Sequence, residues 1–408
     1  MKLIYKWLIF AWKNIWRNRR RSLTTLGISA IGITGILFFG GFALYTYQSL
    51  EEFSARQQGH VLLAQHDYFD KEETTPLALG LSDWQDKQSL LKNIQGVRRV
   101  LPRTSFSGLI SNGDKSTIFI GDGVDAKHEF TVTGPFMEVT HGDILSPNDG
   151  DMPQVMLATG LAKNLNATIG SSLTLLSTTT DGALNGVDVT VVGIFSTGVP
   201  EMDKRKLFVS LATTQSLLNS TKVSLLAVYL KNTQDTHIVE TKIKQLFAEL
   251  STRNWFDLAF FYHKVRDLYD RIFSVVGLVI LIVVLLSVIN TLSMAIMERT
   301  REIGNLSAMG TFQSELLSIF VLEAALLGLM GACSGMLITG GLTVYLQFAE
   351  FIMPPPPGMT QGYPLSIAFS LPMYLKTSAA LVIVIILGAF LTARKGINKP
   401  IIEALTHV

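Results

Sequence analysis

Residues 23–47 read LTTLGISAIGITGILFFGGFALYTY and contain no charged side chain. A helix rises about 1.5 Å per residue, so a run of this length can cross the roughly 30 Å of hydrocarbon in a bilayer. A basic region precedes the run, as in a cleaved signal peptide, but the run is too long and has no small-x-small cleavage site before Gln48. We therefore expect a transmembrane helix here.

Three more apolar runs lie in the last third of the chain. A mean hydropathy of +0.35 with 16% charged residues is too apolar for an ordinary soluble protein of 408 residues. An open chain inside lipid must satisfy its own backbone hydrogen bonds, and a helix does so. The sequence thus predicts a membrane protein with four transmembrane α-helices, at residues 23–47, 271–297, 315–348 and 375–393.

Lysine and arginine indicate which side of the membrane each loop occupies, because basic loops stay preferentially in the cytoplasm. The first 22 residues carry seven basic side chains and no acid, and the loop 298–314 and the tail 394–408 together hold five more: Arg299, Arg301, Arg394, Lys395 and Lys399. The Pro-rich loop 349–374 contains neither lysine nor arginine. We expect both termini in the cytoplasm and residues 48–270 outside it.

The segment 1–22 has an amphipathic pattern, with apolar residues at helical spacing: Leu8, Trp12, Ile15 and Trp16. Its basic side chains face elsewhere on such a helix. A helix of this kind can lie along a membrane surface with its apolar side in the interface. A surface helix and a simple basic flank that sets the topology both remain compatible with the residues.

Residues 48–270 alternate β-like runs, turns and short amphipathic helices, which predicts a large extracytoplasmic α+β domain. Ser49–Gln58 and Arg266–Arg271 are expected to continue the first two spans as helical stalks. The predicted strands are His60–Gln65, Ser116–Gly121, Gln154–Ala158, Ser172–Ser177, Val187–Phe195, Leu207–Ser210 and Ser224–Leu230. The predicted helices are Trp84–Ile94, Thr159–Asn166, Ala212–Leu218 and His237–Leu250.

Motifs of catalysis and cofactor binding are missing from the sequence, which has no GxxxxGK[ST], HExxH or GxSxG. We therefore expect no catalytic residue, no metal site, no cofactor bound by the chain itself and no nucleic-acid partner. His60, His66 and Asp67 match no standard metal-ligand spacing and are expected on a solvated surface. Gly121 and Gly123 mimic part of a dinucleotide fingerprint, but we interpret them as a turn. Cys333 is the one cysteine, so an intramolecular disulfide is excluded.

Polar and small residues inside the spans suggest helix contacts. Asn290 and Glu323 stand at similar depth in the second and third spans, and we expect them to be neighbours because a carboxyl group in hydrocarbon needs a partner. Gly331 and Gly335 form a GxxxG motif, and Gly32 similarly allows close approach in the first span. These glycines could pack within the chain or form a dimer face.

The loop between the second and third spans contains ERTREIGNLSAMG at residues 298–310. On a helix, Ile303, Leu306 and Met309 or Gly310 fall on one side, and the charged residues spread over the rest. Such a helix could lie on the membrane or bind in a groove of another protein, and the residues alone favour the membrane surface. The candidate site residues of this loop are Glu298, Arg299, Arg301, Glu302, Ile303, Gly304, Leu306, Met309 and Gly310.

The same string, followed by LEAALLGLMGACSG at residues 322–335 and a tail containing ARK and IEAL, resembles the FtsX/MacB/LolC-type permeases of ABC transporters. That resemblance implies that the loop is a coupling helix docked into a separate cytoplasmic ATPase, which would bind ATP and Mg. It also implies a MacB-like periplasmic core domain between the first two spans and a location in a bacterial inner membrane. The order Leu306, Ser307, Ala308 departs from the family's usual L+A pattern.

The outside domain resembles the lipoprotein-releasing LolC/LolE group at VVGIFSTGVPEMDKRKLFVSL (residues 191–211), at Gly123–Asp125 and at Leu157–Gly170. The implied function is mechanotransmission, in which ATP hydrolysis moves the periplasmic domain to release lipoproteins from the inner membrane toward the outer membrane. The alternatives are MacB-like efflux of a hydrophobic compound or peptide, and FtsX-like regulation of a periplasmic partner without transport. Implied partners are the ATPase, a second permease copy or paralogue, and a periplasmic lipoprotein carrier or adaptor. If the protein moves a cargo, we expect an apolar groove along the route of that cargo, in the outside domain or between the spans.

Overall fold

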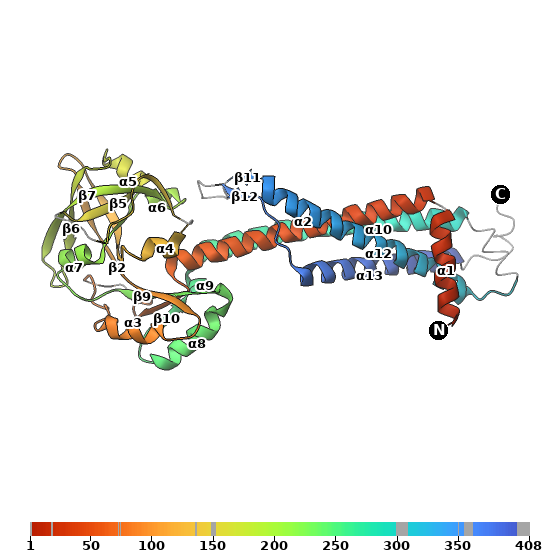
Figure 1. The fold of residues 1–408 in the computed structure, drawn as a ribbon, viewed down its shortest axis with the longest axis horizontal. Coiled ribbons are helices and arrows are strands. Elements are labelled where there is room, and N and C mark those ends of the chain that lie inside the picture. Colours follow the sequence, from red (N-terminus) through yellow and green to blue (C-terminus); the bar gives the residue numbers. More distant parts are fainter. Residues whose placement is uncertain are drawn as a thin grey trace. The chain divides into compact units, whose positions relative to one another are not determined.

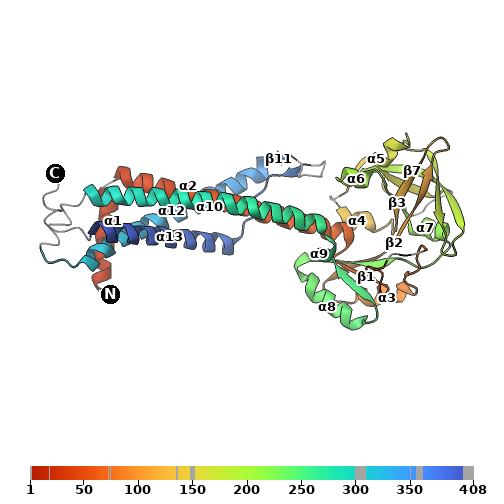
Figure 2. The ribbon, with the colours of Figure 1, turned by 180° about the vertical axis from the view of Figure 1, so that it is seen from behind.

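The computed structural model describes residues 2–17, 19–71, 73, 75–134, 137–147, 152–298, 309–349, 351–354 and 362–397. The chain divides into two compact units. The first, here called the helical unit, comprises Met1–Tyr47, Val265–Ile352 and Pro364–Val408. The second, here called the domain, comprises Gln48–Lys264 and Met353–Tyr363. Figure 1 and the reverse view in Figure 2 show long helices in the first unit and strands with short helices in the second.

Four helices are long and apolar enough to cross a membrane, which confirms the predicted set of four: Ser22–Gln58, Tyr262–Glu298, Gln313–Ala349 and Leu371–Lys395. They belong to α2 (Arg19–Gln58), α10 (Phe260–Glu298), α12 (Gln313–Ala349) and α13 (Leu371–Ile397). Ile33 and Leu37 of α2, Val284 and Val288 of α10 and Ile385 of α13 share one buried apolar cluster. The α2 helix continues without a break through the predicted stalk, residues 49–58.

The N-terminal helix α1 (Lys2–Arg17) packs against α12. Its contact side holds Ala11, Asn14 and Ile15, which are buried, whereas Trp12 and Trp16 are 43% and 53% exposed. The predicted apolar face is therefore divided, because Ile15 packs inside the chain and the two tryptophans remain on its surface.

Part of the domain is a closed barrel. Its strands pair in the circular order β2 (Val97–Ser111), β3 (Ser116–Val124), β8 (Lys206–Ser210), β5 (Gln154–Ala158), β7 (Leu184–Ser196), β6 (Ser172–Thr178) and back to β2. Of these pairs, β3 with β8 and β5 with β7 are parallel. Inward residues such as Phe119, Leu175 and Val209 fill the barrel, and β4 (Glu138–Gly142) extends it beside β7.

The other part is an open antiparallel sheet in the order β10 (Ser251–Asn254), β1 (Val61–Ala64), β9 (Leu225–Leu230) and the first half of β2. Leu91 of α3 (Trp84–Lys92) and Ile243 of α8 (Thr236–Leu246) are buried in one core with residues of β1 and β9. β2 therefore belongs to both parts, since its first residues pair with β9 and those from Arg103 onward pair with β3.

Short elements complete the described chain: α4 (Glu129–Thr133), α5 (Thr159–Asn164), α6 (Pro200–Asp203), α7 (Leu211–Leu218), η2 (Thr233–Asp235), α9 (Trp255–Leu258) and the ribbon of β11 (Ile352–Met353) and β12 (Tyr363–Pro364). Helix α7 contacts five of the barrel strands, and Leu217 and Leu218 are buried in the barrel core.

The seven predicted strands and four predicted helices are all found, with ends shifted by a few residues. The strands β2, β4, β10, β11 and β12 were not predicted. The turn expected at Gly121 and Gly123 is wrong, because both glycines lie inside β3. A Cβ atom on Gly121 would come within 2.8 Å of the Phe106 ring, and one on Gly123 within 2.2 Å of the Thr214 hydroxyl oxygen. These two glycines leave room for side chains packed across the strand.

Candidate functional site

The predicted coupling loop lies mostly outside the described residues, which resume at Met309 after Glu298. The roles expected for Arg299, Arg301, Glu302, Ile303, Gly304 and Leu306 therefore stay predictions. Of the described members, Glu298 is the last residue of α10, and Met309 is 75% exposed just before α12. Gly310 has φ +91°, a left-handed conformation that glycine adopts readily.

The three candidate packing glycines lie at close helix contacts within the chain. A Cβ atom on Gly331 would lie 2.6 Å from Cβ of Ser29, and one on Gly335 would lie 2.9 Å from the carbonyl oxygen of Ala30. A Cβ on Gly32 would lie 2.2 Å from Cγ2 of Val284. Glycine therefore brings α12 against α2 and α2 against α10. We call this set of contacts the glycine seam.

Asn290 and Glu323 differ in burial. Glu323 is 3% exposed in the interior of the helical unit, whereas Asn290 lies on an exposed side of α10. Val288 and Leu292, two positions before and after Asn290, are both buried, so Asn290 points away from the packed face. This arrangement does not favour the expected pairing, and their proximity stays a prediction.

The end of α2 is held by a buried arginine of the domain. Arg103 on β2 donates from Nη1 to the carbonyl oxygens of Gln57, at 2.8 Å, and Gln58, at 3.0 Å. The last carbonyls of a helix have no partner within it and carry partial negative charge, so a cation there satisfies both needs. Arg103 also donates from Nη2 to Glu129 and to the Tyr229 hydroxyl. We call these contacts the Arg103 cap.

The neighbouring carboxylate of Glu129 keeps the Arg103 side chain charged. Burial alone would lower the pKa of Arg103, but the adjacent Glu129 raises it above its ordinary value. Burial raises the pKa of Tyr229, so its hydroxyl stays protonated. Nearby, burial would raise the pKa of Asp122, yet the pairing with Lys206 lowers it. The end of α2 is thus bound to the domain by charged hydrogen bonds.

Two further contacts join α2 to α10. The hydroxyl of Tyr262 donates to Glu51 at 2.8 Å within the domain, and the hydroxyl of Tyr47 donates to Asp270 within the helical unit. Beside them, Arg56 pairs with Glu52 at 2.9 Å. The two helices that enter the domain are therefore bonded to each other in both units.

His60, directly after α2, corrects one expectation from the sequence. It was expected on a solvated surface, but it is 3% exposed, with Nε2 3.1 Å from the hydroxyl of Thr233 and Nδ1 accepting from the backbone N–H of Leu230 at 3.4 Å. Burial lowers its pKa to about 4. Among the described residues, no cluster of His, Cys, Asp and Glu is arranged to hold a metal ion.

The motif around residues 191–211 has a structural role. Asp203, which is buried, accepts hydrogen bonds from N–H and Oγ1 of Thr197 at 2.9 and 2.6 Å. It also accepts from Ser196 at 2.9 Å and Thr159 at 3.1 Å. A Cβ on Gly160 would lie 2.8 Å from the backbone of Asp203. These residues hold the loop after β7 against α5, so their pattern reflects packing.

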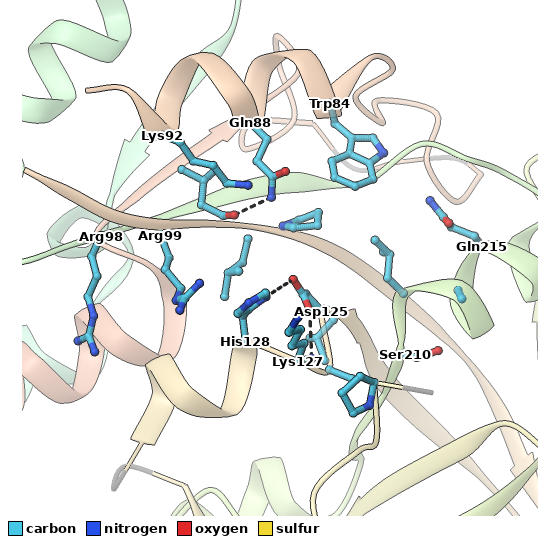
Figure 3. Close-up of a pocket in the computed structure, with 18 residues that line it drawn as sticks. Trp84, Gln88, Lys92, Arg98, Arg99, Asp125, Lys127, His128, Ser210 and Gln215 are labelled. Carbon is cyan, nitrogen blue, oxygen red and sulfur yellow. Dashed lines mark hydrogen bonds and ion pairs between the residues drawn. The ribbon is translucent and has the colours of Figure 1, made fainter. Parts of the chain in front are cut away.

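A cleft with a volume of about 880 Å³ lies in the domain between α3, the first half of β2, the turn before α4 and the start of α7. Figure 3 shows Lys92 and Gln88 on α3, with Asp125, Lys127 and His128 below them and Arg98 and Arg99 at the left. Basic side chains are therefore prominent in this cleft, which differs from the apolar groove expected for a cargo route.

Family comparisons cover both units. Residues 22–246 match the model described as MacB-like periplasmic core domain, and residues 274–401 match the model described as FtsX-like permease C-terminal. The lipoprotein-releasing system transmembrane protein LolC of Neisseria meningitidis is 23% identical over 333 residues, which are 78% of each chain. LolE of Haemophilus influenzae is 21% identical over 287 residues, 66% of this chain and 67% of LolE. An uncharacterized ABC transporter permease of Methanocaldococcus jannaschii is 23% identical over 355 residues, 81% of this chain and 82% of the relative.

Proposed function

The chain belongs to the FtsX/MacB/LolC-type family of ABC transporter permeases, and from this premise we propose that it releases lipoproteins from an inner membrane. In this proposal a separate cytoplasmic ATPase, which binds ATP and Mg, drives movement of the chain's periplasmic domain. The chain itself supplies the membrane path and the moving parts. Its motion is transmitted from residues 298–310, which dock into the ATPase, to the domain.

The observation that carries the coupling part of the proposal is the Arg103 cap. Helix α2 contains an apolar segment long enough to span a membrane and ends on Gln58, whose carbonyl accepts from a buried arginine of the domain. A helix terminus held by charged hydrogen bonds cannot shift without disturbing β2, where Arg103 lies. Movement of α2 would therefore displace β2, the strand that the open sheet and the barrel share.

The lipoprotein part rests on the relatives. LolC and LolE are named as components of lipoprotein-releasing systems, and the LolC alignment spans 78% of both chains. We propose in addition that the permease pairs with a second copy or a paralogue, that both termini lie in the cytoplasm, and that a periplasmic carrier or adaptor receives the cargo.

The test is reconstitution with the ATPase that copurifies with the chain. Proteoliposomes carrying both subunits and a fluorescent acylated lipoprotein should release it into solution on addition of ATP and a soluble lipoprotein carrier. The Glu302→Lys variant should insert in the membrane but lose ATPase binding and release, because it reverses a charge in the predicted docking helix. Glu249→Lys, an exposed charge reversal in the domain, should behave as the unmodified chain.

Three results would count against parts of this proposal. Normal ATPase association by Glu302→Lys would contradict the docking role of residues 298–310. ATP-dependent export of a small hydrophobic compound without lipoprotein release would indicate efflux. ATP hydrolysis that changes the domain but moves neither cargo would indicate regulation of a periplasmic partner.

A further inference from the structure

The cleft of about 880 Å³ in the domain contains an excess of positive charge. Lys92 comes from α3, Arg98 and Arg99 come from β2, and Lys127 comes from the turn before α4. Among the described lining residues, Asp125 supplies the one carboxylate. It is already engaged by His128, at 2.9 Å, and by the backbone N–H of Lys127, at 3.0 Å. The balance of charge in the cleft is therefore positive, and it attracts anions.

These cations differ from other basic residues of the same domain. Arg103, Lys206 and Arg253 each pair with a carboxylate. In the part of the chain that the structure describes, the side chains of the four cleft cations, Lys92, Arg98, Arg99 and Lys127, make no ion pair or hydrogen bond. Four cations from three separate elements thus surround one space without counter-charges, an arrangement suited to an anionic ligand.

The backbone of β2 indicates how such a ligand is held. β9 pairs with β2 from Val97 to Arg103, but β3 pairs only from Arg103 onward, so the other edge of residues 98–102 borders the cleft. The carbonyl of Val100 is occupied by the side-chain amide of Gln88 at 2.7 Å, and Pro102 has no N–H. Both features block the addition of another strand. Recognition must therefore come from side chains.

Apolar side chains line the same cleft and limit the class of ligand. Trp84 and Leu211, which are partly exposed, and Pro147 and Ala212, which are exposed, supply this apolar lining. A single phosphate ion would leave most of this space and its apolar lining unused. A peptide that carries both carboxylates and apolar side chains matches both kinds of lining.

We propose that this cleft binds an acidic, partly apolar peptide segment of a partner protein outside the cytoplasm. Its carboxylates pair with the four cleft cations, and its apolar side chains contact Trp84 and Leu211. Because the inference concerns docking of a partner and not the cargo, it stands whether or not the permease releases lipoproteins.

The experiment measures fluorescence anisotropy of a short labelled peptide of alternating glutamate and leucine, added to the full chain in detergent. The unmodified chain should bind this peptide more tightly than its glutamine–leucine counterpart. Arg99→Glu combined with Lys127→Glu should weaken binding by about tenfold, since two attractions become repulsions. Lys242→Glu is the matched control, an exposed lysine of α8 that is not part of the cleft lining, and it should leave binding unchanged.

A charge swap makes the test specific. A lysine–leucine peptide should bind the Arg99→Glu, Lys127→Glu variant better than it binds the unmodified chain. Equal binding of the acidic peptide by both forms, or no binding at all, overturns the proposal. Inorganic pyrophosphate and anionic lipid vesicles are tested as competitors of the labelled peptide. If either displaces it more strongly than the unlabelled peptide does, the proposal of a peptide ligand is overturned, because the cleft would then bind phosphate groups.

Discussion

Arg103 on β2 and Glu129 on α4 form an ion pair with only 12% and 3% of their side chains exposed. Burying two charges has a large desolvation cost, which a close pair offsets only when further hydrogen bonds satisfy it. Here the additional acceptors are the last carbonyls of α2 and the hydroxyl of Tyr229. The pair is thus placed where a helix with a membrane-spanning segment ends in the domain.

Replacing Arg103 with alanine should destabilise the domain by about 3–5 kcal/mol, because it leaves the carboxylate of Glu129 buried and unpaired. Thermal unfolding of the full chain in detergent measures this loss. The matched control is Arg253→Ala, which breaks the exposed pair with Asp70 and should cost about 1 kcal/mol or less. Equal losses of stability for the two variants would show that the Arg103 cap contributes no more to stability than an exposed ion pair does.

The glycine seam gives a prediction for the helical unit. Gly331→Ala places a Cβ 2.6 Å from that of Ser29, so α2 and α12 must separate, at a cost of about 1–3 kcal/mol. Gly340→Ala, on the same helix, meets nothing within 4 Å and should be neutral or stabilise the helix by up to about 1 kcal/mol. In detergent, the apparent melting temperature should fall for Gly331→Ala and should stay the same or rise for Gly340→Ala.

The strength of the sequence patterns differed between the two units. Uncharged runs such as Leu23–Tyr47 predict membrane helices well, because a bilayer imposes one length and one polarity on them. In the domain, strands with regular apolar alternation were found, but β2 was missed although it is the longest. Arg98, Arg99 and Pro102 interrupt the apolar pattern in the first half of β2. The pattern is irregular there because one edge of that half borders the cleft instead of a neighbouring strand.

For the candidate site too, the sequence predicted some residues but not their contacts. The glycines of the seam could be identified from their spacing, but only the structure shows that they pack within the chain. No sequence pattern indicated the buried contacts of His60 and Arg103, because a single polar residue beside or within a strand looks the same whether it is solvated or buried. Their partners, Thr233 and Glu129, lie 173 and 26 residues away in the chain. Long-range hydrogen bonds of this kind leave no periodic pattern.

Asp203 should be a strong contributor to domain stability. Asp203→Ala removes the acceptor of four hydrogen bonds and leaves buried donors on Ser196 and Thr197, with an expected loss of about 3 kcal/mol. Glu201→Ala, two residues earlier, removes a side chain that is 81% exposed and should change stability by about 0.5 kcal/mol or less. Chemical denaturation of the full chain distinguishes the two. A small effect of Asp203→Ala would mean that the loop after β7 is held by other contacts.

His60 should make the domain less stable in mild acid. Its ordinary pKa of 6.5 falls to about 4 in the folded chain because burial disfavours the charged ring. Above about pH 6.5 the ring is neutral in both states and the full stability is present; as pH falls toward 4 the unfolded chain gains a proton first, which removes up to about 3 kcal/mol. Melting temperatures between pH 7.5 and pH 4 should therefore fall less steeply for His60→Gln than for the unmodified chain. His237→Gln, at a side chain that is 91% exposed, should keep the original slope. If His60→Gln keeps that slope too, the acid sensitivity belongs to other groups.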